Sequence, residues 1–211
     1  MNLHVTHISF MKTVPCILLT LAVAAGSLCA HAEQPTTQVR SSTDRILALL
    51  GDAALKADDR KSERRQLIRR ELDRRIDWAT IARSSLGHHW SKLTPSQRTE
   101  FTDLFSRLLE QTYVSNFETY YRDLDKIEYL GEKIVEEYAS VKVRITTKDA
   151  LIHPVEYRLQ QSGQDWRVYD VLIEGVSLVK NYRDQFDEIL AKSSYEKLAT
   201  DIRAKLTEAS P

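Results

Sequence analysis

Asp170 is the residue of this chain whose surroundings best suit a catalytic group. It lies in the run Trp166-Arg-Val-Tyr-Asp-Val-Leu-Ile173, where most neighbours are apolar and an unpaired carboxylate would be costly to bury. In a pocket, Asp170 could act as a general base on a small apolar substrate, with the hydroxyl group of Tyr169 beside it. Tied to a tyrosine hydroxyl or a backbone amide, it would be a structural anchor, and this is the interpretation that we favour.

Other side chains that could bind a metal or attack a substrate have simpler explanations. His88 and His89 are adjacent, and neighbours on a helix point in different directions, so we expect no shared metal ion. His153 is isolated in a turn-like stretch and is expected to be solvated. Ser177 lacks the second glycine of a Gly-x-Ser-x-Gly nucleophile elbow, because Val179 stands there, and we interpret it as a helix cap.

The sequence also contains no Gly-rich phosphate loop and no His-Glu-x-x-His zinc helix. We therefore predict a protein that is not an enzyme, with no catalytic residue, no metal and no cofactor.

Residues 166–173 have more apolar side chains than one face of a strand needs. Trp166, Val168 and Leu172 share one parity of a two-residue period, while Tyr169, Val171 and Ile173 share the other. Such a strand is covered on both sides. In an antiparallel sheet with one helical layer, the second face needs another cover, and a bound apolar ligand is one candidate.

Residues 1–32 are predicted to be a secretory signal peptide that is cleaved after Ala32. Lys12 precedes an apolar run over residues 17–25, and small residues stand at the cleavage site. The run is shorter than the about 20 residues needed to span a bilayer, which makes a retained membrane helix the weaker alternative. Met11 is an alternative start. We expect a periplasmic protein without a permanent membrane anchor.

The remaining residues, 33–211, are predicted to form a single domain, and we expect a monomer. Cys16 and Cys29 leave with the signal peptide, so no disulfide is expected. Of 30 Lys and Arg only Lys12 is lost, which leaves 29 basic residues against 30 acidic ones. This balance does not favour a polyanionic partner, and we expect no nucleic acid.

The first half of this domain reads as helical. After a polar, frayed stretch at 33–39, the apolar period predicts helices at 43–57 and 58–76. A short helix from the Asp77 cap to Gly87 follows, and then a long one that opens with the capping box Thr94-Pro-Ser-Gln97. Charges in 58–76 mix at three- and four-residue spacing, which favours mutual pairing over a surface for lipid headgroups or a protein partner.

The second half reads as strands followed by two helices. We expect about four strands, near 126–130, 134–147, 155–161 and 166–174, with a tight hairpin at residues 162–164. Pro154 suggests an edge or a bend. The fold class is therefore α+β.

Four groups of residues carry a resemblance to a known family. They are Ile76-Asp-Trp78 with Leu86-Gly87 and Trp90; Thr94-Pro-Ser-Gln-Arg98 with Phe101, Phe105, Leu109, Thr112 and Tyr113; Val155-Glu-Tyr-Arg-Leu159; and Trp166-Arg-Val-Tyr-Asp-Val-Leu-Ile-Glu-Gly-Val-Ser-Leu-Val-Lys-Asn-Tyr-Arg-Asp-Gln-Phe186. In order and spacing the chain resembles the MlaC family, the periplasmic phospholipid-binding proteins of the Mla lipid-transport system, also called toluene-tolerance auxiliary proteins. The likeness covers essentially all of residues 33–211.

The resemblance implies an α+β fold like that of nuclear transport factor 2 (NTF2-like), in which helices wrap a curved antiparallel sheet around an apolar cavity. The cargo would be a phospholipid. The partners would be an outer-membrane lipoprotein and porin complex and an inner-membrane ATP-driven (ABC) transporter, between which the carrier preserves outer-membrane lipid asymmetry.

We expect the sheet face and the aromatic end of the long helix to line the cavity. The candidate lipid-binding residues are Tyr113, Phe117, Tyr121, Val143, Val168, Val171 and Ile173. Three alternatives stay open: a carrier of a hopanoid or another apolar ligand, an NTF2-like small-molecule enzyme that uses Asp170, and a structural adaptor without a ligand.

Overall fold

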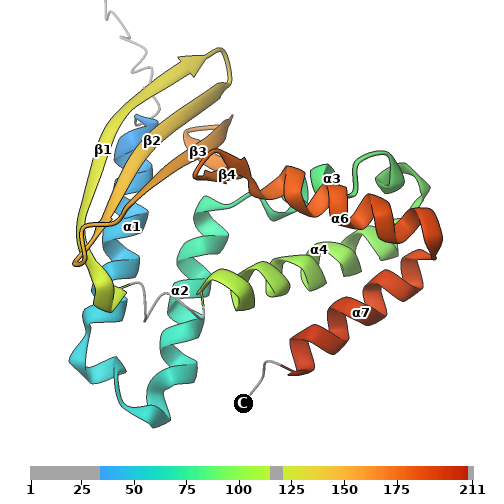
Figure 1. Cartoon of the computed structure of the whole chain (residues 1–211), viewed down its shortest axis with the longest axis horizontal. Coiled ribbons are helices and arrows are strands. Elements are labelled where there is room, and N and C mark those ends of the chain that lie inside the picture. The colour runs from blue at the N-terminus through green and yellow to red at the C-terminus, as the bar shows by residue number, and fades with distance from the viewer. Residues whose placement is uncertain (1–33, 115–120, 209–211) are drawn as a thin grey trace, which may run out of the picture. The chain divides into compact units, whose positions relative to one another are not determined.

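The structure, a computed structural model, describes residues 34–114 and 121–208, all of which belong to one unit of the chain, residues 31–211 (Figure 1). The predicted signal peptide and the candidate site residue Phe117 lie outside the described residues.

Helices make up the first half of the described chain, as expected. They are α1 Pro35–Gly51, the 3₁₀ turns η1 Ala53–Leu55 and η2 Asp58–Arg60, α2 Lys61–Arg75, α3 Trp78–Leu86, the 3₁₀ segment η3 Gly87–Lys92, α4 Pro95–Leu109 and the π-helical turn η4 Glu110–Val114. Three predicted caps are present. Asp77 accepts from the backbone N–H of Thr80, Thr94 and Gln97 form the capping box, and Ser177 accepts from Lys180.

Helix α1 begins eight residues earlier than its apolar period predicts. Residues 33–39 were expected to be frayed, but Gln38 and Val39 are buried against the sheet. The Gln38 side chain accepts from the backbone N–H of Trp166 (3.0 Å) and from the Arg75 guanidinium, and it donates to the carbonyl oxygen of Gln164 (3.0 Å). A polar residue with three distant partners is invisible to a hydrophobic pattern, which explains the error.

The sheet has five antiparallel strands in the order β1-β2-β3-β4-β5, and Figure 1 shows it curving alongside α1. The strands are β1 Leu124–Val135, β2 Tyr138–Thr147, β3 Ile152–Ser162, β4 Asp165–Ile173 and the short β5 Val176–Ser177. One prediction needs correction, because the β1–β2 turn falls at Glu136 and Glu137, inside the range expected to be one strand. Of the two explanations for Pro154, an edge is excluded, since β3 lies between β2 and β4.

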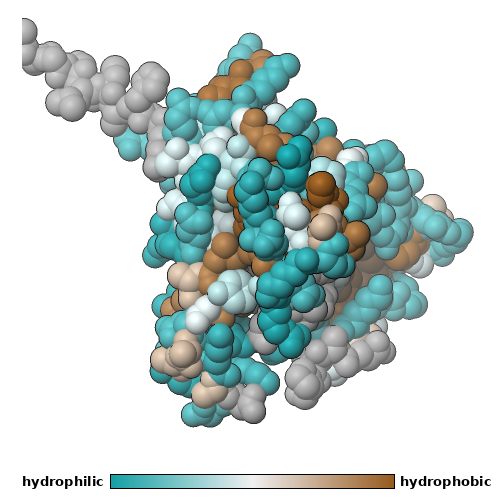
Figure 2. Space-filling view, turned by 60° about the vertical axis from the view of Figure 1, so that its left-hand side comes forward, coloured by the Kyte–Doolittle hydropathy of each residue, from teal (hydrophilic) through white to brown (hydrophobic). Residues whose placement is uncertain are grey.

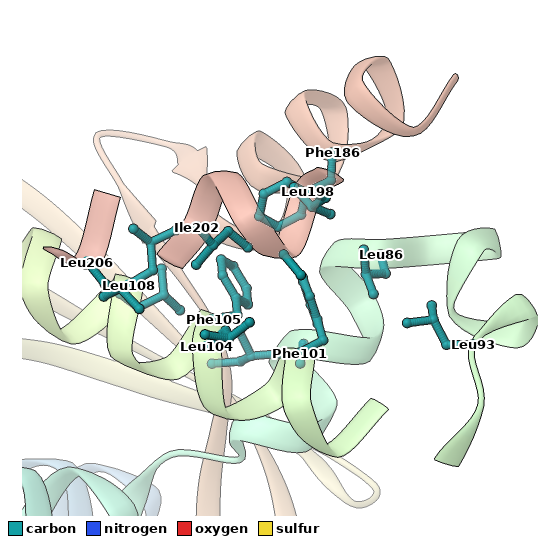
Figure 3. Packing of buried hydrophobic residues seen from close by; sticks show 14 of the residues in the cluster. Leu86, Leu93, Phe101, Leu104, Phe105, Leu108, Phe186, Leu198, Ile202 and Leu206 are labelled. Atoms are coloured by element: carbon teal, nitrogen blue, oxygen red, sulfur yellow. The ribbon is translucent and has the colours of Figure 1, made fainter. Parts of the chain in front are cut away.

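Two helices complete the chain, α6 Leu178–Lys192 and α7 Tyr195–Glu208. With α3 and α4 they enclose a hydrophobic cluster around Phe101, Phe105 and Phe186 (Figure 3). The rings of Phe101 and Phe105 stack at 5.4 Å, and Phe186 meets Phe105 edge-on at 5.2 Å. This cluster is the core of the helical layer.

A second cluster lies between the sheet and α1. Its buried members are Val39, Ala139, Val141, Val143, Val155, Leu159, Trp166 and Val168. Ile76, between α2 and α3, packs against both clusters and forms an isolated bridge to Val168. The candidate site lies in the second cluster, on the face of the sheet that meets α1.

Candidate ligand-binding site

One face of the sheet gathers the apolar side chains of four strands. Across β2, β3 and β4, the register aligns Val141 with Tyr157 and Val171. The next row aligns Val143 with Val155 and Ile173. Because directly opposed residues in an antiparallel pair share a face, all six lie on the face that meets α1, which we call the inner face.

A β-bulge at Tyr169 brings Trp166 and Val168 of β4 to this face as well. Arg158 pairs with Asp170 and Leu159 pairs with Val168, so Tyr169 has no partner on β3. The extra residue shifts the two-residue alternation by one position. Val168 therefore lies on the inner face together with Val171 and Ile173, and the expectation that they occupy opposite faces is wrong.

Burial divides the inner face into two parts. In one, Ala139, Leu159, Trp166 and Val168 are almost fully buried, next to Val39 of α1. In the other, which we call the open part, the apolar side chains keep accessible surface. Its members are Ile127, Ile145, Tyr157, Val171 and Ile173. These accessible apolar side chains form a surface that an apolar ligand could contact.

Two tyrosines of this face are partly removed from water. Burial raises the pKa of Tyr157 to about 12, although the residue keeps some accessible surface. Burial also raises the pKa of Tyr129, whose ring lies under the Arg40 guanidinium at 4.1 Å from the ring centroid. Desolvation disfavours the phenolate in both cases.

The structure brings some of the predicted site residues together and separates others. Val143, Val168, Val171 and Ile173 share the inner face, with Val143 and Val168 buried and Ile173 39% exposed. The other two described residues lie elsewhere. Tyr113 packs against the helical cluster beside Tyr182, and the Tyr121 hydroxyl group closely approaches Gly51 at the end of α1.

Three residues of the open part were missed as site residues: Ile127, Ile145 and Tyr157. Their strands alternate apolar and polar residues, and this pattern places Ile145 with Val143 and Tyr157 with Val155. The signal was therefore present in β2 and β3. Figure 2 shows apolar residues gathering in the middle of one face of the molecule with hydrophilic residues around them.

The protein-family model of the MlaC protein matches residues 40–204. The chain belongs to the MlaC family.

Two named relatives and one solved structure are similar to this chain. It is 28% identical over 188 residues to the toluene tolerance protein ttg2D of Pseudomonas putida, covering 83% of this chain and 82% of the relative. It is 20% identical over 199 residues to the intermembrane phospholipid transport system binding protein MlaC of Haemophilus influenzae, covering 93% and 92%. A phospholipid-binding protein from Ralstonia solanacearum, solved in complex with a phospholipid, aligns with a TM-score of 0.74 at 23% identity over 85% of this chain and 100% of its own. The α+β fold expected for the family is confirmed.

In this member of the MlaC family, Asp170 is an anchor for helix α6. The carboxylate is 5% exposed and accepts from the backbone N–H groups of Val171 (2.9 Å) and Val179 (3.1 Å) and from the Ser177 hydroxyl group (2.7 Å). It lies on the face of β4 opposite Val171, and Arg158 approaches it at 3.7 Å. A carboxylate with these partners ties the start of α6 to the sheet.

Some charges of the Arg-rich segment 58–76 pair within the segment, as predicted, and others pair with neighbouring elements. Arg60 pairs with Glu63 (2.7 Å), and Arg69 with Asp73 (2.8 Å) and with Glu110 of η4 (2.6 Å). Within residues 34–114 and 121–208, no helix combines the length and apolar character needed to cross a bilayer.

Proposed function

We propose that this protein is a periplasmic phospholipid carrier. The observation that carries the proposal is the open part of the inner face, an apolar surface that stays accessible inside a MlaC-family fold. The name of the Haemophilus influenzae relative and the phospholipid in the Ralstonia solanacearum structure support a phospholipid as the cargo.

The physical need for such a carrier is large. Two acyl chains contain around 30 methylene groups, and at about 0.8 kcal/mol each their exposure to water costs on the order of 20 kcal/mol. An apolar recess removes most of this cost while leaving release into either membrane near balance. The direction of transport must then come from an energy-consuming partner, an inner-membrane ATP-driven transporter, with an outer-membrane lipoprotein and porin complex at the other end of the route.

The export signal that the sequence predicts in residues 1–32 supports this role, because a carrier between two membranes works in the periplasm. We propose that the cargo contacts the open part of the inner face. The buried residues Val143 and Val168 support that surface from the core. Tyr113, Phe117 and Tyr121 lie in the sequence that joins α4 to β1, and they remain proposed contacts.

Lipid extraction tests the proposal. The exported chain is purified from the periplasm without detergent, extracted with organic solvent and analysed by mass spectrometry with phosphate quantification. We expect close to one phospholipid per protein. A folded protein without lipid would overturn the carrier function, and a hopanoid or another lipid without phosphate would replace the cargo.

The enzyme alternative is left without an observation in its favour. Each oxygen of the Asp170 carboxylate already accepts a hydrogen bond that fixes α6, so the group that suggested a general base has a structural role.

A further inference from the structure

Three side chains that can bind metal converge on the surface of the helical layer. His88 and His89 belong to η3, and Asp187 belongs to α6. The Asp187 oxygen Oδ1 is 2.9 Å from His89 Nε2 and 3.8 Å from His88 Nδ1. The three ligand atoms all lie within 4.8 Å of one another, and no other such group of three is found in residues 34–114 and 121–208.

His88 and His89 are neighbours in the 3₁₀ segment η3, yet their rings lie close together. Gly87, at φ +53°, ends α3 and turns the chain just before them. The two rings lie against each other, with centroids 3.9 Å apart and planes tilted by 37°. They approach the same carboxylate through different nitrogens, Nδ1 of His88 and Nε2 of His89, and this compensates for the different directions of their Cα–Cβ bonds.

The separations between the Asp187 oxygen and the two histidine nitrogens are close to those around a small transition metal. Metal–ligand bonds of about 2.0–2.1 Å in a tetrahedral site hold ligand atoms roughly 3.3 Å apart. The observed separations of 2.9 and 3.8 Å lie on either side of that value. The side chains of His88 and Asp187 are 68% and 57% exposed, so small rotations can equalise the distances.

The charges of the site also suit a cation. Asp187 supplies one negative charge, and the nearby cation on the same helix, Arg183, is directed elsewhere, since its Nε donates to the carbonyl oxygen of Ser84 at 2.7 Å. His89 is the most enclosed ligand, with 12% of its side chain exposed. The side chains of His88 and Asp187 are largely exposed, so a water molecule can reach the outer side of the site as a fourth ligand.

We propose that His88, His89 and Asp187 form a binding site for a divalent transition metal of the Zn²⁺ and Cu²⁺ type. Two imidazole nitrogens and one carboxylate oxygen favour such ions over Ca²⁺ and Mg²⁺, which select oxygen ligands. A bound ion would clamp η3 to α6, at a site distinct from the inner face of the sheet.

Zinc titration of the untagged, exported chain tests the proposal. Isothermal calorimetry should show one saturable Zn²⁺ site of micromolar affinity or tighter and no site for Ca²⁺. Loss of an outer-shell partner of a metal site weakens metal binding by about 10–100-fold. A larger loss of Zn²⁺ affinity is expected for each variant that removes a direct ligand, which are His88→Ala, His89→Ala and Asp187→Asn. Co²⁺ in place of Zn²⁺ should give the visible absorption of a coordinated ion.

His153→Ala is the matched control. His153 also pairs with a carboxylate, Glu174, at 2.9 Å, but no third ligand joins them among the described residues. Zinc should raise the melting temperature of the wild type and of His153→Ala, and leave that of His88→Ala unchanged. Absence of saturable Zn²⁺ binding, or binding that survives in all three ligand variants, would overturn the proposal and leave a plain hydrogen bond between His89 and Asp187.

Discussion

Val168 and Val171 project from the same face of the sheet although they are three residues apart on one strand. Their partners on β3 are Leu159 and Tyr157, which are two residues apart. Tyr169 takes up the difference as a bulge and meets the ring of Tyr138 edge-on, at 6.0 Å between centroids. The bulge gives the inner face more apolar residues of β4 than regular alternation would, and it leaves Asp170 on the opposite face, where α6 begins.

Val171→Asp should abolish phospholipid loading. A carboxylate in the open part of the inner face would have to be desolvated by acyl chains, which costs several kcal/mol and more than tenfold in occupancy. The measurement is bound lipid per folded protein after purification without detergent. Ile173→Asp should also lose lipid. Because Ile173 is 39% exposed, this variant should fold more readily than Val171→Asp.

Val135→Asp is the control for this pair. Val135 lies at the end of β1 beside the β1–β2 turn and is 53% exposed, so the same change of side chain should leave lipid content at the wild-type level. Normal loading of both folded inner-face variants would mean that the ligand lies elsewhere.

Regular elements and their ends could be predicted from the sequence because local chemistry determines them. The capping box at Thr94 and Gln97 and the caps at Asp77 and Ser177 need only neighbouring residues to form. The alternation of apolar and polar residues in β2 and β3 likewise indicates which of their side chains point inward, since a half-buried strand has period two.

The bulge and the start of α1 could not be predicted, because partners far along the chain determine both. Residues 166–173 read as a strand with two apolar faces until the register with β3 shows that Tyr169 is extra. Gln38 reads as a frayed polar residue until Trp166, 128 positions later, is seen to donate to it. The composition of the inner face therefore depends on pairing, and a single sequence does not display pairing.

Gln38→Ala should destabilise the fold by about 2 kcal/mol, since it leaves the buried N–H of Trp166 without its acceptor. The free energy of unfolding from urea titration, followed by tryptophan fluorescence, measures this. Thr37→Ala, one residue earlier and exposed, should change it by less than about 0.5 kcal/mol. Equal effects of the two substitutions would show that the first turn of α1 is not docked on the sheet.

Asp170→Ala should destabilise the protein by about 3 kcal/mol, because the N–H of Val179 and the Ser177 hydroxyl group lose a buried, charged acceptor. Asp170→Asn keeps one acceptor oxygen and should cost less. Asp184→Asn, at an exposed carboxylate of α6 that pairs with Lys180, should cost less than about 1 kcal/mol. Lipid content per folded protein should stay unchanged in all three, and a selective loss of lipid in the Asp170 variants would instead make this carboxylate a cargo contact.

Tyr157→Phe should remove a loss of stability that the wild type shows in alkaline solution. Burial raises the pKa of Tyr157 in the folded protein to about 12, while in the unfolded chain it ionises near its ordinary value of about 10. Between these values the unfolded chain has lost the phenolic proton and the folded protein still holds it, so the unfolded state gains stability as the pH rises. Burial of the protonated Tyr157 hydroxyl group contributes its full stabilisation of the folded state below about pH 10. This contribution, on the order of 2–3 kcal/mol, is lost as the pH rises to about 12.

The other tyrosines are present in both proteins, so the difference between their unfolding free energies isolates Tyr157. Urea titrations at intervals from pH 8 to 12 should show the wild type losing its stability more steeply than Tyr157→Phe above pH 10. Parallel curves would mean that the hydroxyl group of Tyr157 is solvated, and the open part of the inner face would then be wet instead of a dry recess suited to acyl chains.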